Sequence, residues 1–291
     1  DLLDGRARGS VTMLDRSGEV FAWSGDQFGG VVTADSVSPH LRNAVIATED
    51  RRFYWHFGIS PQGIAGAIRI NLAEGRGPLS GHGGSTITQQ TAKLLCLGTA
   101  FDPEQWSSEA AYLADCRETS LARKGREAIY AMAMETAYTK DEILSIYLNR
   151  AYFGGGAYGA EAAAQRYFSK PAATLDPGEA AMLAGLLTAP SRLAPTADLE
   201  ASQARAATVL RLMHEQDYID EETMRFHQQN PATLSDEAEQ TRGGYFADWV
   251  MQSGPDFFTR DTTEDVVIQT TLDQSIQNAI AIGDYDGDGF D

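Results

Sequence analysis

The chain begins with a short β pattern and then changes to a helical one. Residues that favour strands lie on both sides of Asp15 to Gly18, so residues 11–23 predict a hairpin with its turn there. Apolar residues then recur at helical spacing behind the pairs Ser38-Pro39 and Ser60-Pro61. A serine N-cap followed by proline at the first helical position is a typical helix start. The sequence therefore predicts helices that begin at these two pairs.

The helical pattern continues through the middle of the chain. We expect a third helix capped by Ser85, and later helices over Ser120 to Ala137, from Thr139, over Ala157 to Phe168, from Asp176 and over Leu199 to Gln216. Thr139 to Glu142 has the pattern of a capping box. Beyond about residue 226 the composition becomes more polar, and Val266 to Leu272 is typical of a strand.

These patterns predict a mainly α protein in three parts. We expect an N-terminal β segment over residues 1–36 and one helical domain over residues 37–225. Residues 226–291 are expected to form a linker that begins a second module without completing it. The chain begins at Asp1 without an initiator Met, so we expect a segment of a longer protein or a mature form.

Composition narrows the possible partners. The chain has 291 residues, with 23 Lys and Arg against 41 Asp and Glu, which gives a formal net charge of −18. Proteins that bind nucleic acid carry basic surfaces, so this charge argues against a nucleic-acid partner. It also argues against electrostatic attachment to anionic lipid. The sequence contains no run of ~20 apolar residues, which is the length that a membrane-spanning helix needs.

The two cysteines, Cys96 and Cys116, flank a segment rich in Ser, Ala, Asp and Glu. They are either two independent thiols or a bridge that closes a surface loop, and a bridge requires an oxidising compartment. A bridge of this span would stabilise the fold by about 3 kcal/mol in the chain-entropy model. A zinc site is not expected, because two thiols without a nearby pair of histidines do not supply its ligands.

Two polar segments carry the candidate chemistry. Gly83 to Gln90 places two glycines before a run of hydroxyl and amide side chains, which suits close approach of the backbone to a ligand. Upstream, Glu49 and Asp50 precede the aromatic run that begins at Phe53, so a carboxylate lies in a partly apolar setting. Together the two segments indicate a sugar-transfer site.

A third group lies at helical spacing on the helix predicted from Ser120. Arg123 and Lys124 lie four and three residues before Glu127, so all three side chains share one helix face. Taken alone, this pattern favours a solvated face with salt bridges.

These segments together resemble the peptidoglycan glycosyltransferase domain of class A penicillin-binding proteins and monofunctional transglycosylases, glycosyltransferase family 51. Three blocks carry the resemblance: Glu49-Asp50-Arg51 with Phe53, His56 and Gly58; Gly84-Ser85-Thr86-Ile87-Thr88-Gln89-Gln90 with Lys93; and Arg123-Lys124 with Glu127. Supporting blocks follow around Asn149 and Tyr152, then from Glu179 to Ser191, so the resemblance covers roughly residues 37–215. Residues 243–280 resemble, more weakly, the linker before the transpeptidase domain of class A proteins.

The resemblance implies a lysozyme-like helical fold and the polymerisation of lipid II. The growing glycan on its polyprenyl pyrophosphate would be the donor, and the 4-hydroxyl of an incoming lipid II the acceptor. Glu49 matches the catalytic general base, and the aromatic side chains after it are expected to raise its pKa. Glu127 matches the second essential carboxylate, for which we favour an orienting role. The substrate-binding positions would be Ser85, Thr86, Gln89, Gln90, Lys93, Arg123, Lys124 and Asn149.

The resemblance also implies where the protein works and what it meets. No cofactor is obligatory, and a divalent cation, Mg²⁺ or Mn²⁺, could assist. The aromatic segment Phe53 to Ile59 would contact the bilayer, and a transmembrane anchor would lie outside this chain. The protein would therefore act at the outer, periplasmic face of the bacterial cytoplasmic membrane. We expect Asp50 and Arg51 to support the site and His56 to be a structural hydrogen-bonding residue.

One departure from the family pattern concerns the cysteines. Between Lys93 and Arg123 lie 29 residues, more than we expect for the family, and the excess contains both Cys96 and Cys116. In relatives this region borders the donor side of the cleft, so we predict a disulfide that stiffens it.

Three functions remain open at this point. A lysozyme-like lytic enzyme is the nearest alternative to a lipid II polymerase, but a hydrolase has no pyrophosphate to bind with Arg123 and Lys124. An inactive wall-binding scaffold is the non-enzymatic alternative.

The segment from Asp284 to Gly289 is similar to the start of a calcium-binding loop. The given sequence ends before the position of the last calcium ligand, so we expect an unrelated loop.

Overall fold

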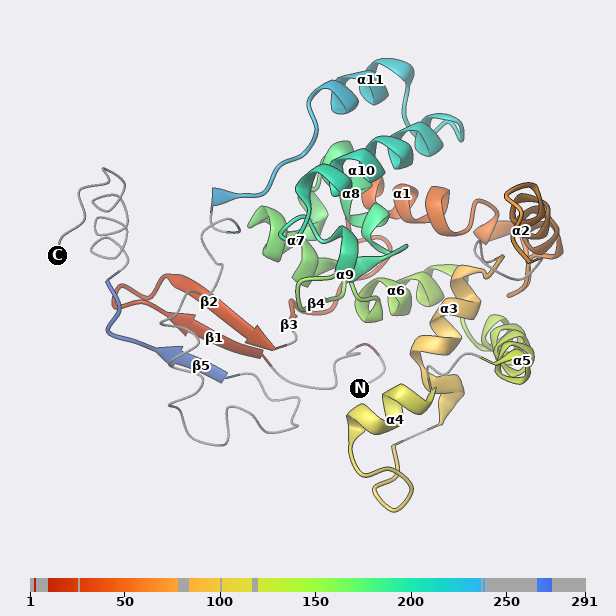
Figure 1. The fold of residues 1–291 in the computed structure, drawn as a ribbon, viewed down its shortest axis with the longest axis horizontal. Coiled ribbons are helices and arrows are strands. Elements are labelled where there is room, and N and C mark those ends of the chain that lie inside the picture. Colours follow the sequence, from red (N-terminus) through yellow and green to blue (C-terminus); the bar gives the residue numbers. More distant parts are fainter. Residues whose placement is uncertain are drawn as a thin grey trace.

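The computed structural model describes residues 3, 10–25, 27–77, 84–99, 101–116, 120–236, 238 and 266–273. Most of these residues are helical, as the sequence predicts, and a small sheet lies beside the helical body (Figure 1). The helices are α1 (Pro39–Glu49), α2 (Pro61–Ala73), α3 (Ile87–Leu94), α4 (Glu109–Cys116), α5 (Leu121–Ala137), α6 (Lys140–Arg150), α7 (Ala160–Phe168), α8 (Pro177–Leu186), α9 (Pro190–Leu193), α10 (Leu199–His214) and α11 (Glu221–Gln229). Short 3₁₀ helices lie at Phe53–Trp55, Cys96–Gly98 and Ala172–Thr174.

The predicted hairpin forms, and the strand predicted near the C-terminus joins it. Strands β1 (Ser10–Leu14) and β2 (Val20–Gly25) pair antiparallel. Strand β5 (Val266–Gln269) pairs with β1 in parallel, so the sheet order is β2-β1-β5. The described strands from the first and last parts of the chain thus belong to one sheet.

The core of the helical body is built around α8. Every residue from Gly178 to Leu186 except Glu179 is buried, which is the pattern of a helix surrounded by protein on all sides. Helices α1 and α10 both pack against α8. Because α1 is held on the core in this way, its last residue, Glu49, has a fixed position at the edge of the body.

Local capping explains most of the helix starts. Ser38, Ser60 and Ser120 each accept a hydrogen bond from a backbone N–H in the first turn of the helix that follows. Thr139 with Glu142 and Asp176 with Glu179 form complete capping boxes.

The structure differs from the prediction in three local places. The cap of α3 is Thr86 instead of Ser85, because Thr86 forms a capping box with Gln89. The helix predicted from Ala157 starts only at Ala160, because residues Ala157–Tyr158 form strand β4, paired with β3 (Gln27–Phe28), and Gly159 turns the chain with φ 87°. Helices α4, α9 and α11 were not predicted, although Asp220 caps α11 by a bond from the Thr223 N–H.

Two glycines allow helices to approach the loops around the candidate site closely. A Cβ added to Gly84 would lie 2.6 Å from the Cα of Ile64 in α2. A Cβ added to Gly58, whose φ is +79°, would lie 2.8 Å from the backbone carbonyl carbon of Ala131 in α5. These close contacts hold the segment before α3 against α2, and the loop after Glu49 against α5.

Candidate active site

Glu49, the predicted general base, is the last residue of α1 and is bonded to α3. The side-chain Nε2 of Gln90 donates to Oε2 of Glu49 over 2.8 Å. The Tyr147 hydroxyl in turn donates to Oε1 of Gln90 over 3.1 Å, which fixes the orientation of the amide. Glu49 is half-buried and Tyr147 is fully buried, so this carboxylate is both held in place and open to a ligand on one side.

The environment of Glu49 favours its neutral form. Burial raises the pKa of the Glu49 carboxyl above its usual 4.5, and the nearby carboxylate of Asp50 acts in the same direction. The hydrogen bond from Gln90 and the charge of Arg205 oppose this rise in the pKa. A carboxyl group with a raised pKa is a stronger base once it has ionised, which suits proton transfer.

The aromatic run contributes to this environment less than the sequence indicates. Phe53 is buried, but Tyr54 and Phe57 are exposed and Trp55 is 88% exposed. An indole that is open to solvent cannot exclude water from a carboxylate. The surroundings of the Glu49 carboxylate are instead set by Gln90 of α3, which is bonded to it, and by Tyr147 of α6, which is bonded to Gln90.

Asp50 ties the first sequence block to the second. Its Oδ2 accepts a hydrogen bond from the backbone N–H of Ile87 over 3.0 Å, at the start of α3. The same oxygen lies 2.8 Å from Nε2 of His56. Both side chains are nearly buried, so Asp50 and His56 position the loop and helix around Glu49.

Thr86 and Gln89 have their polar groups engaged within the fold. The Thr86 hydroxyl accepts from the Gln89 N–H and donates to the carbonyl of Gly58 over 2.6 Å. Oε1 of Gln89 accepts from the Thr86 N–H over 3.1 Å. Both side chains are buried. These bonds fix the start of α3, and the substrate contact expected of both residues stays a prediction.

The open side of this segment carries other polar residues. Ser85, Gln90 and Lys93 are half-exposed, whereas Thr86 to Gln89 are buried. Gln90 and Lys93 are three residues apart, so they lie on the same side of α3 as the Glu49 carboxylate that Gln90 contacts.

The third block forms a charged cluster at the start of α5. Glu127 is buried, and its two oxygens contact Nη1 of Arg123 at 2.6 Å and Nζ of Lys124 at 2.5 Å. Nζ of Lys124 also donates to the Ser85 hydroxyl over 2.6 Å. The Lys124 side chain is 43% exposed, so its ammonium group is held in place and remains accessible. Glu127 thus contacts both cations, and the orienting role that we favour for it stays a prediction.

The predicted site residues, with one exception, come together around α3. Gln90 joins this helix to Glu49, and Ser85 just before it joins the cluster of Arg123, Lys124 and Glu127. Ser85 and Gln90 are five positions apart, and a helix rises only ~1.5 Å per residue. The segment from Ser85 to Gln90 therefore connects the Glu49 carboxylate to the cluster that contains Lys124.

Asn149 is the exception. Its amide nitrogen donates to the carbonyl of Val32 over 2.6 Å, and its oxygen accepts from the Val32 N–H over 2.9 Å. The amide also bonds the Ser145 carbonyl, and the residue is buried. These hydrogen bonds connect the segment before α1 to α6 and so stabilise the fold.

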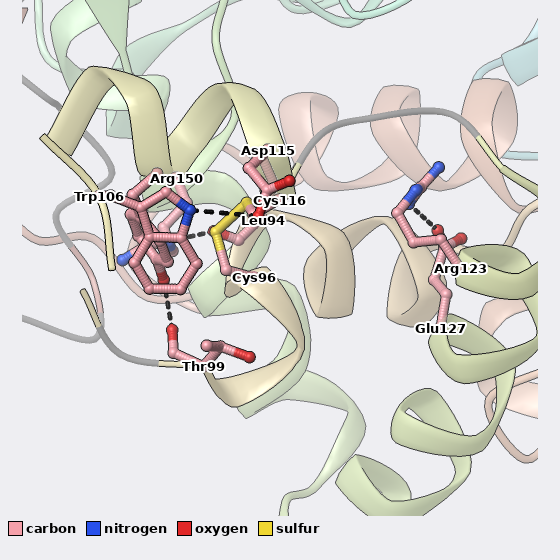
Figure 2. Close-up of a disulfide and its surroundings, with 10 residues drawn as sticks. Leu94, Cys96, Thr99, Trp106, Asp115, Cys116, Arg123, Glu127 and Arg150 are labelled. Atoms are coloured by element: carbon pink, nitrogen blue, oxygen red, sulfur yellow. Dashed lines mark hydrogen bonds and ion pairs between the residues drawn. A yellow bond between two sulfur atoms is a disulfide. The ribbon is translucent and has the colours of Figure 1, made fainter. Parts of the chain in front are cut away.

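The cysteines form a disulfide in the structure. Cys96 is bonded to Cys116, which ties the 3₁₀ helix after α3 to the end of α4 (Figure 2). The loop that it closes lies directly before Ser120, the cap of α5. The disulfide therefore restrains the segment that leads into the charged cluster.

The resemblance allows for a divalent cation, and Glu127 would be its carboxylate ligand. Both oxygens of Glu127 are already bonded to cations. Within the described ranges, no group of three or more His, Cys, Asp or Glu is placed to hold a metal ion. With both of its oxygens paired to cations, the Glu127 carboxylate does not fit a metal ligand in this arrangement.

Comparison with known proteins shows the family to which this helical domain belongs. The family model described as Transglycosylase matches residues 17–214. The chain therefore belongs to the transglycosylase family.

Individual relatives agree with this family. The chain is 38% identical to the biosynthetic peptidoglycan transglycosylase of Salmonella agona, over 71% of this chain and 78% of that protein. It is 39% identical to penicillin-binding protein 1A of Aquifex aeolicus, over 82% of this chain and 30% of that protein. The corresponding protein of Mycobacterium tuberculosis is 37% identical over 85% of this chain and 29% of its own length. The chain thus spans under a third of these two penicillin-binding proteins.

Proposed function

We propose that this chain polymerises lipid II into glycan strands by an inverting glycosyl transfer. The observation that carries the proposal is the link, through Gln90 and Ser85, between a carboxyl group of raised pKa and a cluster of cations. A sugar hydroxyl is a poor nucleophile that needs a base, and a departing pyrophosphate needs positive charge. This arrangement can supply both.

Each residue has a defined task in this reaction. The Glu49 carboxylate takes the proton from the acceptor 4-hydroxyl, whose oxygen then attacks the anomeric carbon of the donor. The bond from that carbon to the lipid pyrophosphate breaks, and the pyrophosphate leaves with the electron pair. Lys93, Arg123 and Lys124 stabilise the charge that develops on it. Ser85 and Gln90 offer hydrogen bonds beside these groups.

The substrate is carried by a lipid, so the reaction takes place at a membrane surface. The exposed side chains Trp55 and Phe57 after α1 lie near Ile64, Ile70 and Leu72 in the sequence, which are exposed on α2. Aromatic and apolar side chains of this kind suit a membrane interface. In the part of the chain that the structure describes, no helix is long and apolar enough to cross a bilayer. We propose that α2 and the preceding loop contact the outer face of the cytoplasmic membrane.

The proposal is tested by giving the protein two labelled substrates. Incubation with lipid II should produce glycan polymer, and incubation with finished glycan should leave its length unchanged. Shortening of the finished glycan would instead identify a lytic enzyme. Binding of lipid II without polymer would identify a scaffold domain. A parallel reaction with EDTA shows whether a divalent cation assists, and we expect Glu127 to work without one.

A further inference from the structure

A small cavity lies between the disulfide-bonded segment and the start of α5. It has a volume of about 220 Å³. Trp106 and Tyr112 line it from the inserted segment, and Arg123 and Arg126 line it from α5. Pockets for drug-sized ligands measure ~300–1,000 Å³, so this cavity has room for only part of a substrate. Of its lining residues, Arg123 belongs to the charged cluster of Arg123, Lys124 and Glu127.

The aromatic wall of the cavity is held in one arrangement. The rings of Trp106 and Tyr112 meet edge to face with centroids 5.0 Å apart. Nε1 of Trp106 donates to Asp115 over 3.2 Å, and the Tyr112 hydroxyl donates to the Thr99 carbonyl. The Cys96–Cys116 disulfide closes the same segment (Figure 2). The inserted residues thus present a preformed apolar surface opposite the arginines.

The charged residues of the cavity favour an anionic ligand. Arg123 and Arg126 are three residues apart on α5, so their side chains lie on the same side of the helix. Asp115 is the acidic side chain in the lining, and it accepts the Trp106 N–H. Guanidinium groups match the two oxygens of a carboxylate in geometry and charge. The aromatic rings add an apolar surface, which a bare phosphate ion would not use.

The position of Arg123 relates this cavity to the reaction. Nη1 of Arg123 and Nζ of Lys124 contact different oxygens of Glu127, and Lys124 extends to Ser85 on the α3 side. Arg123 also lines the cavity, from α5. A group bound in the cavity would therefore lie next to the cations that meet the leaving pyrophosphate.

We propose that the cavity binds the carboxylate-bearing peptide attached to the donor sugar, with Arg126 as its carboxylate ligand and the Trp106–Tyr112 pair as its apolar wall. This inference rests on the proposed function, because a peptide carried by the glycan is present only if the protein acts on peptidoglycan precursors. The site would make the enzyme selective for donors with a free peptide carboxylate.

The test is the variant Arg126→Gln, since Arg126 is exposed and lies outside the proposed catalytic groups. Arg225→Gln is the matched control, because Arg225 is an exposed arginine on α11 that pairs with Glu221. Polymerisation is measured with lipid II that has free peptide carboxylates and with lipid II whose peptide carboxylates are amidated. We expect Arg126→Gln to raise KM roughly ten- to a hundredfold for the first substrate, as loss of a charged hydrogen bond does. The amidated substrate and the control variant should show less than a twofold change.

Equal changes on both substrates, or no change on either, would overturn the inference. A direct binding measurement separates this failure from failure of the proposed function. A soluble N-acetylmuramyl peptide is titrated into the wild type and the two variants by calorimetry. If the wild type makes no polymer, the proposed function is wrong. The titration then still shows whether the cavity binds the peptide. Weaker binding to Arg126→Gln alone supports the site, whereas equal binding to all three, or no binding, contradicts it.

Discussion

Gln90 of α3 donates a hydrogen bond to the carboxylate of Glu49, with 2.8 Å between Nε2 and Oε2. The bond crosses between two sequence blocks that are 41 positions apart. It opposes the rise in the Glu49 pKa that burial causes. Gln90 therefore lowers the pKa of the carboxyl group that we propose as the base.

Replacement of Gln90 by Leu should shift the pH dependence of polymerisation. Without the hydrogen bond, the pKa of Glu49 rises further, so the acidic limb of the kcat profile should move to higher pH. The loss of rate should be largest at low pH and should shrink as the pH rises. Tyr147→Phe is the control, because it removes the bond to Gln90 and keeps the one to Glu49. An unmoved limb, or one moved to lower pH, would contradict this role.

The raised pKa of Glu49 also has a consequence for stability. The folded state holds the Glu49 proton more strongly than the unfolded chain, whose carboxyl titrates near 4.5. The contribution of this group to the free energy of unfolding is therefore greatest below that pH, and it decreases as the pH rises through the raised pKa. We expect Glu49→Gln to unfold at a higher temperature than the wild type at pH 8, with this difference largely lost at pH 4. Thermal unfolding at both values measures it, and a less stable variant at pH 8 would contradict the burial cost.

Neighbouring hydroxyl residues at the start of α3 should behave differently. Thr86→Ala removes the helix cap and the bond to the Gly58 carbonyl, so it should lower the free energy of unfolding by about 1–3 kcal/mol. Ser85→Ala removes only the contact with Lys124, so it should change stability by less than about 0.5 kcal/mol and raise KM for lipid II. Denaturant titration and steady-state kinetics of both variants test this division. Similar losses of stability in the two variants would show that it is wrong.

The disulfide should stabilise the protein measurably. Cys96 and Cys116 are 20 positions apart, and closing a loop of this size is worth about 3 kcal/mol in the chain-entropy model. We expect the double variant Cys96→Ser/Cys116→Ser to lose about this much in denaturant titrations. Reducing agent should lower the stability of the wild type and leave that of the double variant unchanged. A wild type that is insensitive to full reduction would exclude a stabilising role.

The sequence predicts helix starts well because they depend on neighbouring residues. Ser38, Ser120 and Thr139 each bond the first turn of their own helix, so their pattern is visible locally. The pairing of β5 with β1 joins residues more than 250 positions apart, and no local signal indicates it. Strand patterns show that a strand exists but not which strand it pairs with.

The sequence pattern indicates candidate site residues by type and position. It does not distinguish a side chain that would contact substrate from one that stabilises the fold. A hydroxyl or amide in a polar run can bind a ligand or satisfy the backbone, and the sequence is the same in both cases. Thr86, Gln89 and Asn149 are buried and bonded to the backbone, whereas Ser85 and Gln90 remain half-exposed. Burial, which depends on distant packing, makes this distinction.

The most direct test of the account is polymer formation from labelled lipid II by Glu49→Gln, measured beside lipid II binding by the same variant. The substitution keeps the shape of the side chain and the contact with Gln90, but it removes the proposed proton acceptor. We expect the rate to fall by about 10²- to 10⁴-fold while lipid II still binds. Turnover equal to that of the wild type would show that another group takes the proton, and the proposed mechanism would be wrong.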